Sequence, residues 1–120
     1  MHELSVAQSI IELIQDEARK HGADRLTAVK LRIGKLTAIE PLSLSFCFEL
    51  IAKGTMAEGA RLEIESVPIT GQCRQCGHEF IMEYPLGVCP ECDDLSISIL
   101  TGREFYISEI ETDGETRNPQ

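Results

Sequence analysis

The first 21 residues have the hydrophobic periodicity of an amphipathic helix. Apolar residues recur at spacings of three and four with polar residues between them, as on a helix with one buried face. Ser5 and Gln8 have the spacing of a capping box, and a basic last turn followed by Gly22 is typical of a helix C-terminus. We therefore predict a helix over residues 5–21, with a buried face formed by Ala7, Ile10, Ile11, Ile14 and Ala18.

Further along the chain, apolar and polar residues alternate with the period of half-buried strands. Val29, Leu31 and Ile33 share one face of the clearest such segment, and lysine and arginine occupy the other. A turn at Thr101-Gly102 separates the last two alternating segments. The predicted strands span residues 26–34, 61–65, 95–99 and 103–111.

A second helix is predicted between the first two strands. Pro41 suits the first helical position, where its missing N–H costs nothing, and Gly54 marks the end. Leu44, Phe48 and Ile51 have the spacing of a buried stripe. Cys47 neighbours this stripe, and we interpret it as a small buried apolar residue.

Four cysteines form the pattern C-x2-C-x12-C-x2-C: Cys73, Cys76, Cys89 and Cys92. Two residues between cysteines let both sulfurs of one turn face a common point, and Gly77 can adopt the positive φ that such a turn needs. Four thiolates in a tetrahedron are the ligand set that structural Zn2+ prefers. Paired C-x2-C motifs predict a metal site ahead of two disulfides. Iron held by four thiolates, as in rubredoxin, is an alternative that the spacing leaves open.

The order helix, strand, helix, strand, cysteine segment, strand predicts a two-lobed α+β protein. The final strand is too short to fold alone, so we expect it to return to the first lobe. The first lobe, residues 1–67 and 102–111, is then a small mixed sheet with two helices. The second, residues 68–101, is an inserted four-cysteine ribbon. Residues 112–120 are polar, and we expect them to form a disordered tail.

Composition and charge limit the partners. The formal net charge is −9, which disfavours nucleic acids and anionic membranes. Within residues 68–102, five carboxylates face a single base, Arg74, so the ribbon is not expected to bind phosphate. An odd cysteine beside a metal-type pattern indicates a reducing compartment. Because no apolar run reaches the ~18 residues of a spanning helix and no secretory signal is visible, we expect a cytoplasmic protein.

Several features together resemble the HypA/HybF family of nickel metallochaperones, which act in [NiFe]-hydrogenase maturation. The resemblance covers residues 1–111. It rests on a Met1-His2-Glu3 start, a helix beginning Leu4-Ser5-Val6, Ile33-Gly34, Ala57-Glu58-Gly59 and the four-cysteine pattern.

The resemblance implies a nickel site at the start of the chain. Its ligands would include His2, whose imidazole is a good Ni2+ donor, and the amine of Met1. Glu3 would add a carboxylate or steady the site, and Glu40 matches an acid that lies near nickel in some members. The resemblance also implies two partners, a HypB-like GTPase and the precursor of the hydrogenase large subunit, and zinc at the four cysteines as a structural ion.

No P-loop, nucleophile–base pair or pair of catalytic carboxylates is visible in the sequence, so we expect a delivery protein rather than an enzyme. Two other functions remain open at this stage. One is a rubredoxin-like redox module with iron on the four cysteines. The other is a zinc-ribbon adaptor that binds only proteins and has an inert N-terminus.

Overall fold

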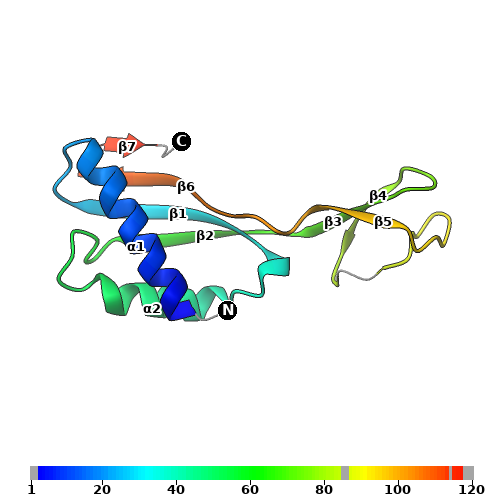
Figure 1. Cartoon of the computed structure of the whole chain (residues 1–120), viewed down its shortest axis with the longest axis horizontal. Helices are drawn as coiled ribbons and strands as arrows, with labels where there is room; N and C mark the ends of the chain where they lie inside the picture. Colours follow the sequence, from blue (N-terminus) through cyan, green and yellow to red (C-terminus); the bar gives the residue numbers. More distant parts are fainter. Residues whose placement is uncertain (1–2, 85–86, 114, 118–120) are drawn as a thin grey trace. The chain divides into compact units, whose positions relative to one another are not determined.

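The computed structural model describes residues 3–84, 87–113 and 115–117 (Figure 1). In this part of the chain it contains two α-helices, one short 3-10 helix and seven strands. In order they are α1 (Glu3–Lys20), β1 (Leu26–Gly34), η1 (Lys35–Thr37), α2 (Pro41–Ala52), β2 (Arg61–Val67), β3 (Ile69–Cys73), β4 (Glu79–Met82), β5 (Ile97–Thr101), β6 (Phe105–Thr112) and β7 (Glu115–Arg117).

The strands form two sheets, and the α+β fold predicted from the sequence is confirmed. A four-stranded sheet has the order β2-β1-β6-β7, and a three-stranded sheet has the order β4-β3-β5. Figure 1 shows β1 and β2 running in the same direction and β6 running back against them. The larger sheet is therefore mixed, with α2 in the crossover between the two parallel strands.

The chain divides into two compact units. Ile33–Ala38 and Ser66–Phe105 form one of them, which we call the ribbon unit; the other described residues form the helical unit. The sequence prediction placed 33–38 with the helices instead. The difference arises because this segment is tied to the chain that leaves β5: Gly34 N–H donates to Glu104 O at 2.7 Å and Leu36 N–H to Gly102 O at 2.8 Å.

Helix α1 begins at Glu3, two positions before the predicted start. Ser5 therefore lies inside the helix, and the capping box expected from Ser5 and Gln8 is not formed. Gly22 (φ +70°) ends the helix in the left-handed conformation that favours glycine. The predicted buried face is confirmed and also includes Val6.

Helix α2 buries Leu44 and Phe48 as predicted, but its third buried residue is Ala52, while Ile51 is only half-buried. The rest of the helix is unusually apolar. Leu42, Phe46 and Leu50 follow one another at spacings of four and are 79%, 63% and 46% exposed. These three residues form one stripe because positions four apart lie on the same side of a helix.

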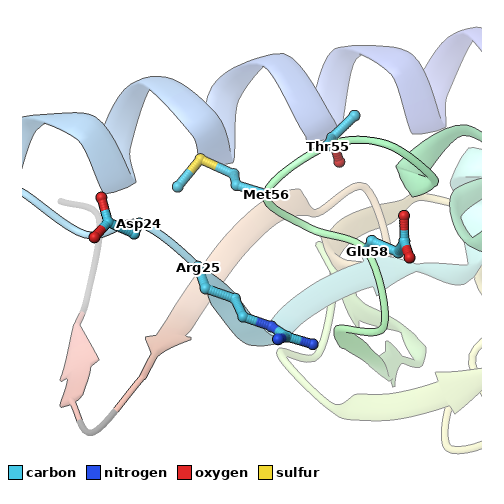
Figure 2. A pocket seen from close by; sticks show the side chains of 5 residues that line it. All are labelled: Asp24, Arg25, Thr55, Met56 and Glu58. Atoms are coloured by element: carbon cyan, nitrogen blue, oxygen red, sulfur yellow. The ribbon is translucent and has the colours of Figure 1, made fainter.

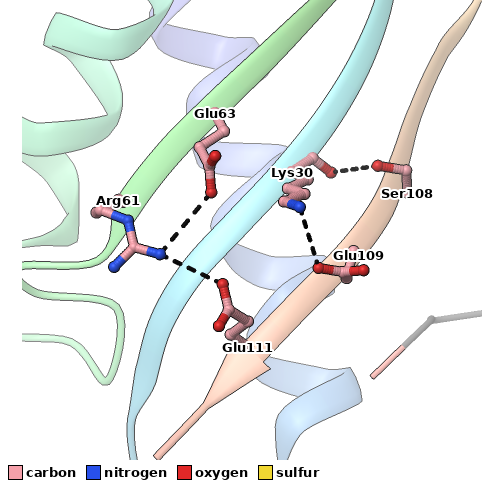
Figure 3. Close-up of polar contacts among 6 residues, drawn as sticks. All are labelled: Lys30, Arg61, Glu63, Ser108, Glu109 and Glu111. Carbon is pink, nitrogen blue, oxygen red and sulfur yellow. Dashed lines mark hydrogen bonds and ion pairs between the residues drawn. The ribbon is translucent and has the colours of Figure 1, made fainter. Parts of the chain in front are cut away.

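The face of the larger sheet that is turned away from the helices carries a group of charged side chains (Figure 3). Lys30 Nζ lies 3.4 Å from Glu109 Oε1, and Arg61 Nη2 lies 3.3 Å from Glu111 Oε2 and 3.9 Å from Glu63 Oε2. These pairs link β1 to β6, β2 to β6 and two residues of β2, and such networks of opposite charges suit a face exposed to water.

The C-terminal segment is more ordered than the sequence predicted. Thr112, expected to start a disordered tail, is 5% exposed and ends β6. Glu115–Arg117 pairs antiparallel with β6 as β7, with Ile110 opposite Arg117. Residues 114 and 118–120 of the predicted tail lie outside the described part. No helix that the structure describes is both long and apolar enough to cross a bilayer.

Candidate metal centre

Two backbone turns with the same hydrogen bonds present the four cysteines. In the first, Gly77 N–H donates to Cys73 O at 2.9 Å, and Cys73 N–H donates to the carbonyl of residue 78 at 2.9 Å. Gly77 has the predicted positive φ, +81°. The turn places two side chains and several N–H groups around one point, as zinc ribbons require.

The second turn repeats this pattern with a different residue at the strained position. Asp93 N–H donates to Cys89 O at 2.8 Å, and Cys89 N–H donates to Asp94 O at 2.9 Å. Asp93 takes the place of the glycine, with φ +61°. Aspartate tolerates the left-handed region better than most residues with a side chain. Sequence reasoning missed this role, although the position of Asp93 directly after Cys92 was a usable signal.

The four sulfur atoms converge on one point. All four Sγ atoms lie within 4.8 Å of one another, and the pairs Cys73–Cys92 and Cys76–Cys89 are 3.5 Å apart. A tetrahedral Zn2+ with Zn–S bonds of 2.3 Å separates its sulfurs by about 3.8 Å, whereas a disulfide needs about 2 Å. At 3.5 Å these sulfurs are too far apart for a disulfide, and all the cysteines are free. The structure thus excludes the disulfide alternative.

Hydrogen bonding and burial shift the pKa values of these thiols in different directions. The backbone N–H of Cys76 points at the sulfur of Cys73 and holds the pKa of that thiol down to about 7. At Cys92 the N–H of Asp94 also lowers the pKa, but the hydrogen bond with Cys73 and desolvation outweigh it and raise the pKa to about 12. A bound cation displaces these protons, since only the thiolate is a metal ligand.

Short polar contacts hold the surroundings of the cluster in place. Arg74 Nε donates to Ser98 Oγ at 2.7 Å, which engages the one base of this segment. The ring of His78 stacks on Phe80 with centroids 5.9 Å apart. Carboxylates therefore outnumber bases around the cysteines, and the one base, Arg74, is already hydrogen-bonded to Ser98. This surface does not favour phosphate.

Two of the residues predicted for nickel, Glu3 and Glu40, lie at the starts of the two helices. Met1 and His2 fall outside the described part of the chain. Glu3 is the first described residue of α1, and its Oε2 accepts a hydrogen bond from the backbone N–H of Glu40 at 3.2 Å. The structure thus brings together the two predicted carboxylate residues, which are 37 positions apart in the sequence.

Glu40 also has a structural role that the sequence reasoning missed. Its carboxylate accepts hydrogen bonds from Leu42 N–H at 2.6 Å and Ser43 N–H at 3.4 Å, so it caps α2. Glutamate is not among the residues most favoured at this position. The available signal was Pro41, whose place at the first helical position makes residue 40 the cap.

Two other features of the helical unit do not contribute to a metal site. Cys47 is half-buried on α2 and is not part of the sulfur cluster. A hollow of about 290 Å³ lies between the α1–β1 and α2–β2 connections (Figure 2). One base and two carboxylates line it, a combination that does not favour an anion; its lining residues are Asp24, Arg25, Thr55, Met56 and Glu58.

Comparison with known proteins gives a consistent result. The family model described as "Hydrogenase/urease nickel incorporation, metallochaperone, hypA" matches residues 1–112. The hydrogenase maturation factor HypA of Chlorobium limicola is 47% identical over 110 residues, which cover 92% of this chain and 95% of that protein. The HypA of Chlorobium luteolum is 44% identical over 115 residues, covering 96% and 98%.

Solved structures agree with these matches. The solution structure of the Ni metallochaperone HypA from Helicobacter pylori has a TM-score of 0.63 and 27% identity, covering 93% of this chain and 97% of that one. A second solution structure of a HypA protein has a TM-score of 0.69 and 28% identity, covering 93% and 96%. The chain therefore belongs to the HypA family of hydrogenase and urease nickel-incorporation metallochaperones.

Proposed function

We propose that this chain binds Ni2+ at its N-terminus and delivers it to the precursor of a [NiFe]-hydrogenase. The observation that carries this proposal is the hydrogen bond between Glu40 N–H and Glu3 Oε2. It supports the proposal because it joins Glu3, the first described residue, to Glu40, a second residue that carries a carboxylate. The family match, which begins at residue 1, supports the same end of the molecule.

The chemistry of the first residues suits a cargo that must be released. The amine of Met1, the imidazole of His2 and the backbone nitrogens of His2 and Glu3 are close in sequence, so they can chelate one ion. Nitrogen-rich sites of tetragonal geometry suit Ni(II). A terminal site with few packing constraints can also open, in contrast to a closed structural site with four protein ligands.

We assign a different role to the four-cysteine cluster, that of a structural site for Zn2+. Four thiolates whose sulfurs are 3.5–4.8 Å apart fit this ion and leave no open position for chemistry. Iron would fit the same ligands, as in the redox-module alternative. Metal analysis separates the two directly, because ferric iron with four thiolates is coloured and zinc is not.

The remaining assignments follow from this delivery role. No P-loop is visible in the sequence, so we propose that a HypB-like GTPase is the partner that hydrolyses nucleotide. We also propose that the protein acts in the cytoplasm, since an odd cysteine beside a metal-type pattern indicates a reducing compartment. The salt-sensitive contacts expected of a chain with net charge −9 suit transient encounters with such partners.

The test is a nickel titration of three untagged or minimally altered proteins, with zinc measured in each. Extending the chain by two residues before Met1 moves the free amine away from the imidazole, and His2→Ala removes the imidazole. We expect both changes to reduce nickel affinity by at least roughly tenfold, because each removes one donor of a short chelate.

His21→Ala is the matched control for the loss of a histidine. His21 lies at the other end of α1, where its Nε2 is 3.1 Å from Glu17 Oε2, and its removal should leave nickel binding unchanged. Zinc content and helix content should be constant throughout the series. Normal nickel binding by both the extended protein and His2→Ala contradicts the proposal and favours a zinc-ribbon adaptor with an inert N-terminus.

A further inference from the structure

Strand β2 is an edge of the larger sheet and is paired on one side only within the described residues. The strand order β2-β1-β6-β7 places its other side against no strand. An edge strand presents a row of N–H and C=O groups that a further strand can use. Natural edges are often blocked by proline or by an inward-pointing charge. In β2 the charged residues point outward and the first proline, Pro68, comes after the strand.

A groove of about 200 Å³ runs between this edge and α2. Ala52, Ala57 and Ala60 line it together with Phe48 and Leu62, and the exposed Glu49 is also among its lining residues. A water molecule occupies about 30 Å³ in the liquid, so the groove has room for a whole apolar side chain.

The residues of β2 that face the helices are less covered than those of its neighbour. Leu62, which lines the groove, and Ile64 are half-buried, whereas Val29 and Leu31 of β1 are 0% and 1% exposed. The helical layer therefore covers β1 fully but leaves the edge strand open. A strand added beside β2 would complete this cover, and one of its side chains would enter the groove.

We propose that the β2 edge binds an extended segment of a partner protein that alternates apolar and basic side chains. The segment adds as a fifth strand of the sheet. Its apolar side chains face α2 and fill the groove beside Leu62, and its basic side chains lie on the outer face. This mode uses main-chain hydrogen bonds for affinity and alternate side chains for specificity. It does not depend on nickel binding at the N-terminus.

The charged residues on and near β2 favour a partner segment with basic side chains. On the outer face of β2, Arg61 is shared between Glu111 at 3.3 Å and Glu63 at 3.9 Å, while Glu65 is paired with Arg32 at 2.7 Å. Glu63 is thus the carboxylate whose charge is least compensated. A basic side chain directly across from it would form a favourable cross-strand pair, and Glu49 at the groove adds to the negative potential.

The same charges disfavour a second copy of this chain as the occupant. Two copies would each bring a formal charge of −9 to the contact. Repulsion between like-charged surfaces reduces association. A basic segment from a different protein is therefore the better fit to this edge.

The test uses a fluorescent peptide, as long as β2, in which lysine alternates with valine and leucine. It is titrated into the full-length zinc-loaded protein, and backbone amide shifts are recorded. We expect saturable binding, with the largest shifts over residues 61–65 and 57–60. The same peptide with N-methylated amides keeps its side chains and charge but cannot form strand hydrogen bonds, and it should not bind. A glutamate-for-lysine peptide should not bind either.

One pair of charge variants and one groove variant locate the site. Glu63→Lys should weaken binding of the lysine peptide by roughly tenfold, since it places like charges together on the outer face, whereas Glu12→Lys, the same change at an exposed position of α1, should have a much smaller effect. Ala60→Leu fills the groove and should also weaken binding, while zinc content and circular dichroism report that each variant is folded.

Four results would overturn the proposal: absence of binding, equal binding of the N-methylated peptide, equal effects of the two lysine substitutions, or shifts confined to the ribbon unit. So would sedimentation showing a dimer of this chain paired through β2.

Discussion

The helical unit and the ribbon unit exclude water by different means. In the helical unit, α1, α2 and the strands between them bury a continuous set of aliphatic side chains around Phe48, which is 2% exposed. The ribbon unit buries far less. Among its described residues, the buried apolar set consists of Ile33, Val67, Ile69, Met82 and the two cysteines Cys73 and Cys89.

This difference in buried apolar surface indicates which interactions each unit needs in order to fold. A core of aliphatic side chains contributes about 25 cal/mol for each Å² of apolar surface removed from water, so the helical unit has its own source of stability. Units with small cores usually depend on disulfides or metals. In zinc-finger peptides, metal binding contributes on the order of 10 kcal/mol to folding, which makes the metal the expected main source of stability in the ribbon unit.

The largest expected effect is therefore the loss of one cysteine ligand. Cys73→Ala or Cys92→Ala should abolish zinc binding and unfold the ribbon unit, because a site with three ligands no longer closes around the ion. The helical signal in far-UV circular dichroism should largely remain. Zinc content and limited proteolysis over residues 70–100 measure the two outcomes separately.

Cys47→Ala is the matched control, because Cys47 lies on α2 and outside the sulfur cluster. It should keep one zinc per chain and a protected ribbon unit. If Cys73→Ala also keeps one zinc and stays protected, the ribbon unit is stable without its fourth ligand, and the contrast between the two units disappears.

The next largest effect is expected in the core of the helical unit. Phe48→Ala should lower the free energy of unfolding by about 3–5 kcal/mol, through lost burial and the cavity left behind. Phe46→Ala, on the same helix, should have a much smaller effect because Phe46 is 63% exposed. Urea denaturation followed by circular dichroism compares them. Neither change should release zinc, and zinc loss at the Phe48→Ala transition would show that the two units unfold together.

The sequence predicted the helical unit well where burial has a regular period. The faces of α1 and β1 are correct because 3.6-residue and 2-residue periods set which side chains meet the core. The end of the chain was predicted less well. Thr112 was expected in a disordered tail because the segment is polar, but a polar segment can still pair with a sheet edge through its backbone, as Glu115–Arg117 does.

At the four-cysteine site, residue type and spacing predicted which side chains come together but not the residues that support them. The four cysteines converge as expected, since a C-x2-C turn constrains its own sulfurs. The positive φ of Asp93 and the cap formed by Glu40 were missed, because both depend on local backbone geometry that tolerates several residue types. The contact between Glu3 and Glu40 depends on how two helices pack, which no local pattern in the sequence encodes.

A smaller effect tests the start of α2, where the helical unit meets the proposed nickel site. Glu40→Ala should cost roughly 1 kcal/mol of stability, because two N–H groups of the first turn lose their acceptor. Glu40→Asp keeps a carboxylate with a strong preference for this position and should restore most of the loss. Thermal denaturation compares the three proteins. If Glu40→Ala lowers nickel affinity while Glu40→Asp matches the parent in stability and affinity, the carboxylate contributes to both.

The smallest effect is expected on the charged face of the sheet, where Lys30 and Glu109 join β1 and β6. Their side chains are 45% and 28% exposed, so water and salt screen the pair. A double-mutant cycle with Lys30→Met and Glu109→Gln should give a coupling energy of about 0.2–1 kcal/mol. The coupling should decrease as salt rises, because the screening length falls to about 3 Å at 1 M. A coupling well above this range that salt does not change would mean that the face is shielded from water, and the stability of the helical unit would then no longer rest on its aliphatic core alone.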